Sequence, residues 1–199
     1  MTGTIKKLGI LLICILSAGC GLLNKEQFND TSSYDEPRFN SSEKIELKVN
    51  KIDVMSEFTP SFRRPNIEHL FPISIEKSAR IWANDRLEAV DYASTKQAQV
   101  IIKDASVTEE LEPVDKIFEK DRIKYRATLY IVVKITDANH LSSASTEVEA
   151  WRELTIPADT DIAEKEKYWN QMVYELLNSF NQRMDYNIRK YLSMYIANE

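Results

Sequence analysis

The chain has 199 residues, of which 26 are basic and 31 acidic, so its formal net charge is −5. Hydrophobic residues make up 43% of the chain, which is typical of a globular protein with a buried core. The acidic balance argues against nucleic-acid binding, which needs a basic face. All four glycines lie at or before Gly21, so the rest of the chain has no glycine-rich loop of the kind that binds nucleotide phosphates.

The N-terminal segment has the features of a secretory signal. Lys6 and Lys7 precede an apolar run from Leu8 to Leu16, which is shorter than the roughly 20 residues that span a bilayer and suits the apolar region of a signal peptide. The small residues SAG and then Cys20 follow. This arrangement resembles the lipobox of bacterial lipoproteins, which implies that the Cys20 thiol is acylated and that the chain is cut before it. The alternative is a plain secreted protein with an incidental cysteine.

Three regions follow from this interpretation. Residues 1–19 are expected to be a lipoprotein signal peptide, residues 20–43 a lipidated flexible tether because they are polar and aperiodic, and residues 44–199 a single periplasmic domain. No cysteine follows Cys20, so we expect neither a disulfide nor a cysteine–metal site in the domain. Gly21 favours the outer membrane by analogy with lipoprotein sorting in enteric bacteria.

The first part of the expected domain begins with a strand. Residues 44–54 alternate apolar and polar side chains, with a change of phase at Asn50 and Lys51 that suggests a bulge or a change of twist. Three prolines exclude a long regular element over residues 56–72.

A helix and two further strands are predicted next. Ser74 is a suitable N-cap for a helix that is expected to end near Asp91. Residues 98–108 predict a second strand, and the acidic stretch 109–121 that follows is expected to be a loop. The third strand has the clearest pattern, because every odd position from 123 to 135 is apolar.

A hairpin and a long helix complete the expected domain. Residues 144–156 predict a fourth strand that pairs with the third one. Asp161 and Glu164 resemble a capping box for a helix over residues 162–196, on the order of 50 Å long. Its apolar stripe continues to its end, so we expect part of the helix to extend beyond the sheet or to kink. The predicted fold class is α+β: a small, mostly antiparallel sheet in β-α-β-β-β-α order, packed by two helices, of which the C-terminal one is long.

The sequence contains no recognisable catalytic constellation. His69 and His140 are the two histidines, and both lie in predicted loops without a third metal ligand at suitable spacing. The acidic side chains of Glu109, Glu110 and Glu112 are interpreted as a solvated loop and not as an acid/base pair. We therefore expect no enzyme activity, no cofactor and no metal. An enzyme of unrecognised type stays open, and a buried carboxylate or histidine pair with perturbed pKa values would favour it.

Exposed aromatic and arginine side chains point to a protein partner. Trp151 and Arg152 are adjacent on the fourth strand, and Tyr191 and Tyr195 lie near the end of the last helix. Tyrosine, tryptophan and arginine are enriched in protein interfaces. We therefore expect these four residues to contact a partner, with the alternative that they are ordinary exposed side chains.

The element order resembles that of the LPS-assembly lipoprotein family (LptE). Similar segments are the hairpin strands IKYRATLYIVVKIT and STEVEAWRELTI and the helix start AEKEKYWNQMVYELL. The resemblance implies an outer-membrane lipoprotein that faces the periplasm and fits inside a β-barrel partner of the LPS export machinery. The proline-rich insert at residues 56–72 departs from the family pattern. The alternative function is a ligand-binding accessory lipoprotein of an envelope transporter or synthase, which a pocket with a few convergent polar groups would favour.

Overall fold

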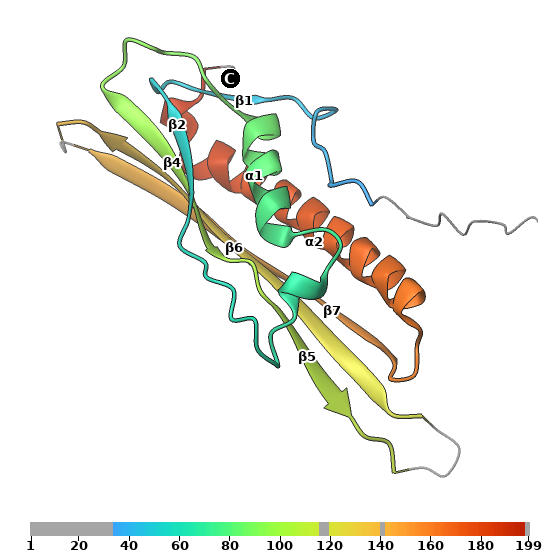
Figure 1. The fold of residues 1–199 in the computed structure, drawn as a ribbon. Helices are drawn as coiled ribbons and strands as arrows, with labels where there is room; N and C mark the ends of the chain where they lie inside the picture. Colours follow the sequence, from blue (N-terminus) through green and yellow to red (C-terminus); the bar gives the residue numbers. More distant parts are fainter. Residues whose placement is uncertain (1–33, 116–119, 140–141, 198–199) are drawn as a thin grey trace, which may run out of the picture. The chain divides into compact units, whose positions relative to one another are not determined.

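A computed structural model describes residues 34–115, 120–139 and 142–197. The expected signal peptide and Cys20 lie outside these residues, as does His140. The described part has the α+β architecture that the sequence predicts, with two α-helices on one face of a sheet (Figure 1). No helix in this part is long and apolar enough to cross a membrane. Its elements are β1 (Ile45–Leu47), β2 (Ile52–Ser56), η1 (Glu68–Leu70), α1 (Ile75–Arg86), β3 (Leu87–Ala89), β4 (Lys96–Asp104), β5 (Val107–Glu112), β6 (Arg122–Asp137), β7 (Ser143–Pro157), α2 (Ile162–Tyr191) and η2 (Ser193–Tyr195).

The main sheet is built around β6, which pairs with β7 on one side and with β4 and β5 in succession on the other. These three pairings are antiparallel, and β2 adds to the outer side of β4 in parallel. The predicted hairpin of two long strands is confirmed, with Ile131 opposite Val148 near its centre. β7 has no strand partner other than β6 among the described residues, so one side of β7 is a free edge.

The core lies between the sheet and the two helices. The odd positions of β6 from Tyr125 to Ile135 are buried, as the alternation predicts, and Ile131 is fully buried. From α2, Trp169 and Phe180 are buried in the same core, and from α1, Trp82 packs edge-on against Phe180. Side chains on the opposite face of β6 and β7 are exposed or half-buried, which is common for an antiparallel sheet.

Both helix starts agree with the sequence. The Ser74 side chain accepts a hydrogen bond from the backbone N–H of Lys77, and the Asp161 side chain accepts one from Glu164. The first helix, however, ends at Arg86 and not near Asp91, because the chain turns directly into β3.

The bounds of the last helix are corrected: α2 ends at Tyr191 and not at residue 196, because the chain continues as the short 3-10 helix η2, and the expected overhang is not observed. α2 has 30 residues and is about 45 Å long, and the 16 residues of β6 span about 50 Å, so sheet lies beneath the helix along its length. The end of the apolar stripe is covered by β1. Leu47 forms a bridge with Ile196, the backbone N–H of Lys48 donates to the carbonyl of Tyr195 at 2.7 Å, and that of Ala197 donates to Glu46.

Three predicted boundaries between strands and loops are also corrected. The stretch 44–54 is not one bulged strand: β1 pairs with β3 in a separate two-stranded sheet, and β2 belongs to the main sheet. The predicted second strand, residues 98–108, is two strands, because β4 ends at Asp104 and β5 begins at Val107. The acidic stretch after residue 108 is not all loop, since β5 continues to Glu112, opposite the basic residues at the start of β6. This register places Glu110 opposite Lys124 and Glu112 opposite Arg122, and opposite charges at such positions favour the pairing of so acidic a strand.

The proline-rich insert, residues 56–72, closes the outer side of β5. The carbonyl of Pro65 accepts the N–H of Glu109, and the N–H of Ile67 donates to Val107. Ile67 is buried, and Phe71 stacks on Trp169 of α2 with ring centroids 4.8 Å apart. Phe62 is the one described residue with positive φ, at 53°.

Candidate interaction surfaces

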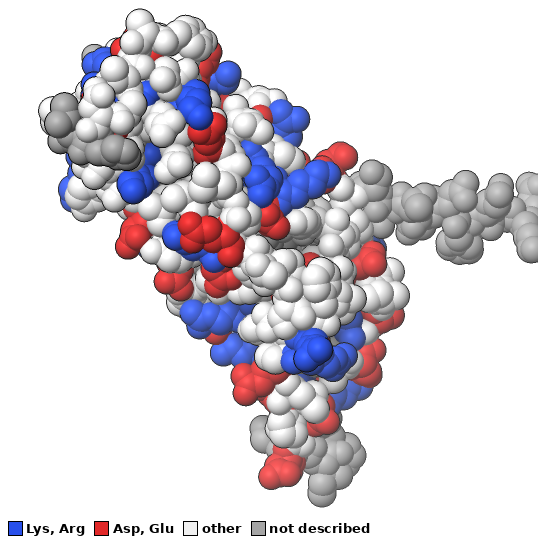
Figure 2. All heavy atoms as spheres, turned by 60° about the vertical axis from the view of Figure 1, so that its left-hand side comes forward, with Lys and Arg blue, Asp and Glu red and all other residues white. Residues whose placement is uncertain are grey.

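The open face of the sheet carries Trp151. Its side chain is half exposed, and the guanidinium of Arg126 lies 4.7 Å from its ring centroid. Arg126 and Lys124 of β6 both pair with Glu153 of β7, at 3.3 and 3.2 Å. On this face the basic residues of β6 thus pair with Glu153 of β7, whereas Glu149 on the same row of β7 forms no ion pair with another described residue. Figure 2 shows an interspersed pattern of basic and acidic side chains over the surface in view.

Arg152 lies on the other face of β7 from Trp151. Strand side chains alternate between faces, so the two residues do not form a single contact patch, although the sequence predicts them together. Arg152 instead lines a cavity of about 240 Å³ between β7 and α2. The rest of the lining is Glu153, Leu154, Tyr168, Gln171, Met172 and Glu175. This volume is below the roughly 300–1,000 Å³ of small-molecule sites and suits a single side chain.

The two predicted tyrosines near the C-terminus have different surroundings. Tyr191 is exposed, and the ammonium group of Lys190 lies 5.1 Å from its ring centroid. Tyr195 is half-buried and packs against the hydrophobic core. Nearby, Tyr186 is also exposed and contacts Lys190 at 5.4 Å. The structure therefore places Tyr191 with Tyr186 at an accessible surface, whereas Tyr195 contributes to the core.

The free edge of β7 is partly closed by α2. The guanidinium of Arg183 donates a 2.8 Å hydrogen bond to the carbonyl of Glu149, and the Asn187 amide donates a 3.0 Å hydrogen bond to the carbonyl of Glu147. Both carbonyls belong to odd-numbered residues of β7. Since one residue's N–H and C=O point to the same side of an antiparallel strand, the odd residues direct their backbone groups to the free edge.

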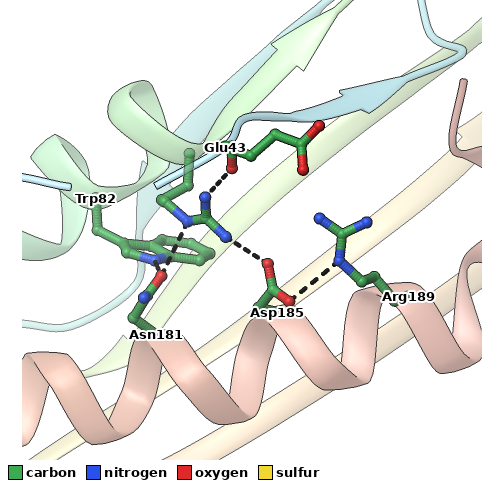
Figure 3. A network of polar contacts seen from close by, with 6 residues as sticks. Glu43, Trp82, Asn181, Asp185 and Arg189 are labelled. Atoms are coloured by element: carbon green, nitrogen blue, oxygen red, sulfur yellow. Dashed lines mark hydrogen bonds and ion pairs between the residues drawn. The ribbon is translucent and has the colours of Figure 1, made fainter. Parts of the chain in front are cut away.

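A buried polar network connects α1 with α2 (Figure 3). The Arg86 side chain, 5% exposed, forms an ion pair with Asp185 and donates a 3.0 Å hydrogen bond to the Asn181 amide oxygen. The indole N–H of Trp82 donates to the same oxygen at 2.9 Å, and Arg189 pairs with Asp185 at 3.1 Å. Burial lowers the pKa of Arg86 despite the attraction of Asp185.

The Arg86 network orients the helices and offers no catalytic group, because its donors and acceptors are bonded to each other. In the sequence, Arg86 is a polar residue at helical spacing with the apolar side chains of α1, such as Ala79 and Trp82, and this pattern does not identify its partner. Among the described residues, no group of three or more histidine, cysteine or acidic side chains is arranged to hold a metal ion. His69 is exposed and contacts the ring of Phe62, with centroids 5.4 Å apart.

The part of the expected tether that the structure describes is packed against the helices. The guanidinium of Arg38 donates to both carboxylate oxygens of Asp85, at 2.9 and 2.8 Å, and the N–H of Phe39 donates to Asp85 at 2.9 Å. The hydrogen bond from Arg38 holds the pKa of Asp85 below its ordinary value. Phe39 is buried, and the Tyr174 hydroxyl donates to the carbonyl of Asp35. The compact unit therefore begins at Tyr34.

No protein-family model matches this sequence, and no curated protein does. Solved structures with some likeness include a minor lipoprotein from Acinetobacter baumannii, with a TM-score of 0.43 and 12% identity over 77% of this chain and 99% of that one. An uncharacterized lipoprotein B from Nitrosomonas europaea has a TM-score of 0.39 and 13% identity over 74% of this chain and 88% of that one. The rare lipoprotein B from Shewanella oneidensis has a TM-score of 0.31 and 14% identity over 68% and 94%. Likenesses this weak carry no argument about family, partner or activity.

Proposed function

We propose that this chain is a non-enzymatic, lipid-anchored protein of the bacterial envelope, which acts by contacting a protein partner at the outer membrane. The observation that carries the proposal is the short apolar run that ends in SAG and Cys20. A diacylglycerol thioether together with an acylated N-terminus would supply more than one acyl chain, which is what stable anchoring requires. The anchored domain would then act in the periplasm.

Two surfaces of the described domain support action through a protein partner. One is the open sheet face with Trp151, and the other is the seam between β7 and α2 with Arg152. Tyr191 and Tyr186 extend that seam towards the end of α2. Tyrosine, tryptophan and arginine are enriched in protein interfaces. The ion pairs of the sheet face are already satisfied within the chain, which suits a contact surface better than a reaction centre.

Within this class we infer a role in LPS assembly, with an outer-membrane β-barrel as the partner. The support is the resemblance in element order, which implies an α+β domain with a long C-terminal helix. The insert at residues 56–72 departs from that pattern, but it packs on β5 and on Trp169 and leaves the sheet face and the seam accessible.

Lipidation is the first test. The Cys20→Ala variant is expected to keep its signal peptide or to be released as a soluble periplasmic protein, because the acylated thiol is missing. Cys14→Ala is the matched control, since Cys14 follows bulky Ile13 and lies inside the apolar run. Gel migration and fractionation of the envelope measure both effects. A Cys20→Ala variant that migrates and fractionates like the wild type would overturn the proposal.

The same preparations test the inferred partner. Wild-type protein purified from detergent-solubilised envelopes of its host is expected to bring down an outer-membrane β-barrel protein, identified by mass spectrometry. Depletion of the wild type should then lower the amount of LPS at the cell surface. Normal surface LPS after depletion would contradict the LPS-assembly role. It would not contradict the proposal that the protein is lipid-anchored.

A further inference from the structure

We propose that the free edge of β7 between Trp151 and Thr155 binds an extended peptide segment of a partner, which adds to the sheet as a further strand and carries basic side chains at alternate positions. This deepens the proposed function, because it assigns a binding mode and a chemical class to the partner contact. The mode is strand addition, in which main-chain hydrogen bonds supply affinity and alternate side chains supply specificity.

The first support is the unequal closure of the β7 edge. Asn187 and Arg183 occupy the carbonyls of Glu147 and Glu149, so α2 blocks strand addition there. Further along the strand, Trp151, Glu153 and Thr155 direct their N–H and C=O groups to the same edge, and no hydrogen bond from another described residue reaches these groups. This open stretch spans about 17 Å, which is the length of a typical strand.

The second support is the cavity beside the open stretch. Arg152 and Leu154 line it from β7, and Tyr168 and Met172 line it from α2. An added strand would point every second side chain towards this helix-facing side of the sheet. With a volume of about 240 Å³, the cavity is suited to one medium-sized apolar side chain of that strand.

The third support is the charge of the row on the other face. Side chains of an added strand on the open face would lie beside Trp151 and Glu153, and a long side chain opposite Trp151 would also reach Glu149 diagonally. The Glu149 side chain is exposed and forms no hydrogen bond or ion pair with another described residue. Basic side chains opposite these positions would be stabilised by cross-strand pairing, and acidic ones would be repelled.

The same glutamates argue against a second copy of the chain as the occupant. Pairing of two β7 edges would bring the acidic rows of both copies together, and like charges opposite each other destabilise a strand pair. Acidic residues along the edge would thus disfavour self-association more than the binding of a basic segment.

The test uses the full chain in detergent micelles and two synthetic peptides of about seven residues. One peptide alternates lysine with leucine or valine, and the other has glutamate in place of lysine. We expect the basic peptide to bind measurably by fluorescence anisotropy and the acidic peptide to bind at least about tenfold more weakly. Amide exchange should slow at Trp151, Glu153 and Thr155, because their N–H groups gain acceptors.

A proline substitution isolates the main-chain contribution. Thr155→Pro removes an N–H that faces the free edge and therefore leaves the bonds to β6 intact, which is the edge position where proline is tolerated. We expect this variant to melt close to the wild type and to bind the basic peptide about tenfold more weakly. Thr155→Val keeps the N–H and should bind like the wild type. If Thr155→Pro lowers the melting temperature strongly, Glu149→Lys serves instead and should reverse the preference between the two peptides.

Three results would overturn the proposal. Equal affinity for both peptides would show that charge does not select the occupant. Unchanged amide exchange at Trp151 and Glu153 would show that binding does not use this edge. A mass that doubles with concentration would assign the edge to a second copy. None of these outcomes depends on lipidation of Cys20, so failure here and failure of the proposed function are distinguishable.

Discussion

Ile131 shows how much one alternating position can contribute to stability. It is fully buried on the helix-facing side of β6, opposite Val148. Ile131→Ala is expected to lower the free energy of unfolding by about 2–5 kcal/mol, because it removes apolar burial and leaves a cavity. Denaturant melts measure this loss.

Thr128 is the matched control on the open face of the same strand, where it is half-buried opposite Trp151. Thr128→Ala should change the free energy of unfolding by no more than about 1 kcal/mol, since no core contact is lost. Equal losses at the two positions would contradict the one-sided burial of β6.

Arg86 shows why the packing between the two helices could not be predicted from the sequence. A polar residue on an apolar helical stripe indicates a buried partner but does not say where that partner is. Here the partners are Asn181 and Asp185, more than 90 residues later in the chain. The positions of Trp151 and Arg152, in contrast, could have been predicted. Their strand was predicted from the sequence, and neighbouring residues of a strand lie on different faces.

Two tyrosines near the C-terminus differ in their surroundings: Tyr191 is the last residue of α2, and Tyr195 lies in η2. Tyr195 is half-buried and packs on the core, whereas Tyr191 is exposed beside Lys190. Tyr195→Ser is expected to lower the free energy of unfolding by about 1–3 kcal/mol through lost burial. Tyr191→Ser should cost no more than about 0.5 kcal/mol.

Thermal melts of both single variants measure this difference in stability. Capture of partners from envelopes measures whether either tyrosine contributes to partner binding. The sequence predicts that both tyrosines contact a partner. Loss of partner capture with Tyr191→Ser at wild-type stability would support that role for Tyr191. A stable Tyr195→Ser variant would contradict the packing described above.

Elements were predictable where one face is buried along a continuous run. β6, β7 and α2 each keep one period over many residues, so their positions and their buried faces follow from the sequence. The change of phase at Asn50 and Lys51 marks the break between β1 and β2, but the pattern does not distinguish a bulge from two separate strands, because both pieces have the period of a strand. Which sheet each piece joins depends on partners far away in the chain, β3 and β4.

At the scale of the whole molecule, the segment that leads to the expected anchor is joined to the helices through Asp85. Its pKa lies below the ordinary value because of the hydrogen bond from Arg38. A lowered pKa in the folded state adds stability that is present above the unfolded-state pKa, about 4 for aspartate, and is lost as the pH falls through the folded-state value. We therefore expect the wild type to lose stability on acidification below about pH 4.

Asp85→Asn is the variant that tests this linkage. It should be less stable than the wild type near neutral pH, and the difference should narrow on acidification as the wild-type carboxylate becomes protonated. Denaturant midpoints over a pH series measure both curves. Glu88→Gln, at an exposed position just after α1, is the control and should follow the wild type. A gap between Asp85→Asn and wild type that stays constant with pH would contradict the role of the carboxylate.

The backbone has a consequence for how the sequence can vary. From Leu22 onwards the chain contains no glycine, and among the described residues only Phe62 has a positive φ. Positive φ is the main reason for which a loop position becomes restricted to glycine or asparagine. Apart from Phe62, no described turn position carries this restriction to glycine or asparagine. Relatives of this protein are therefore expected to keep the alternation of β6 and β7 while their loop sequences diverge freely.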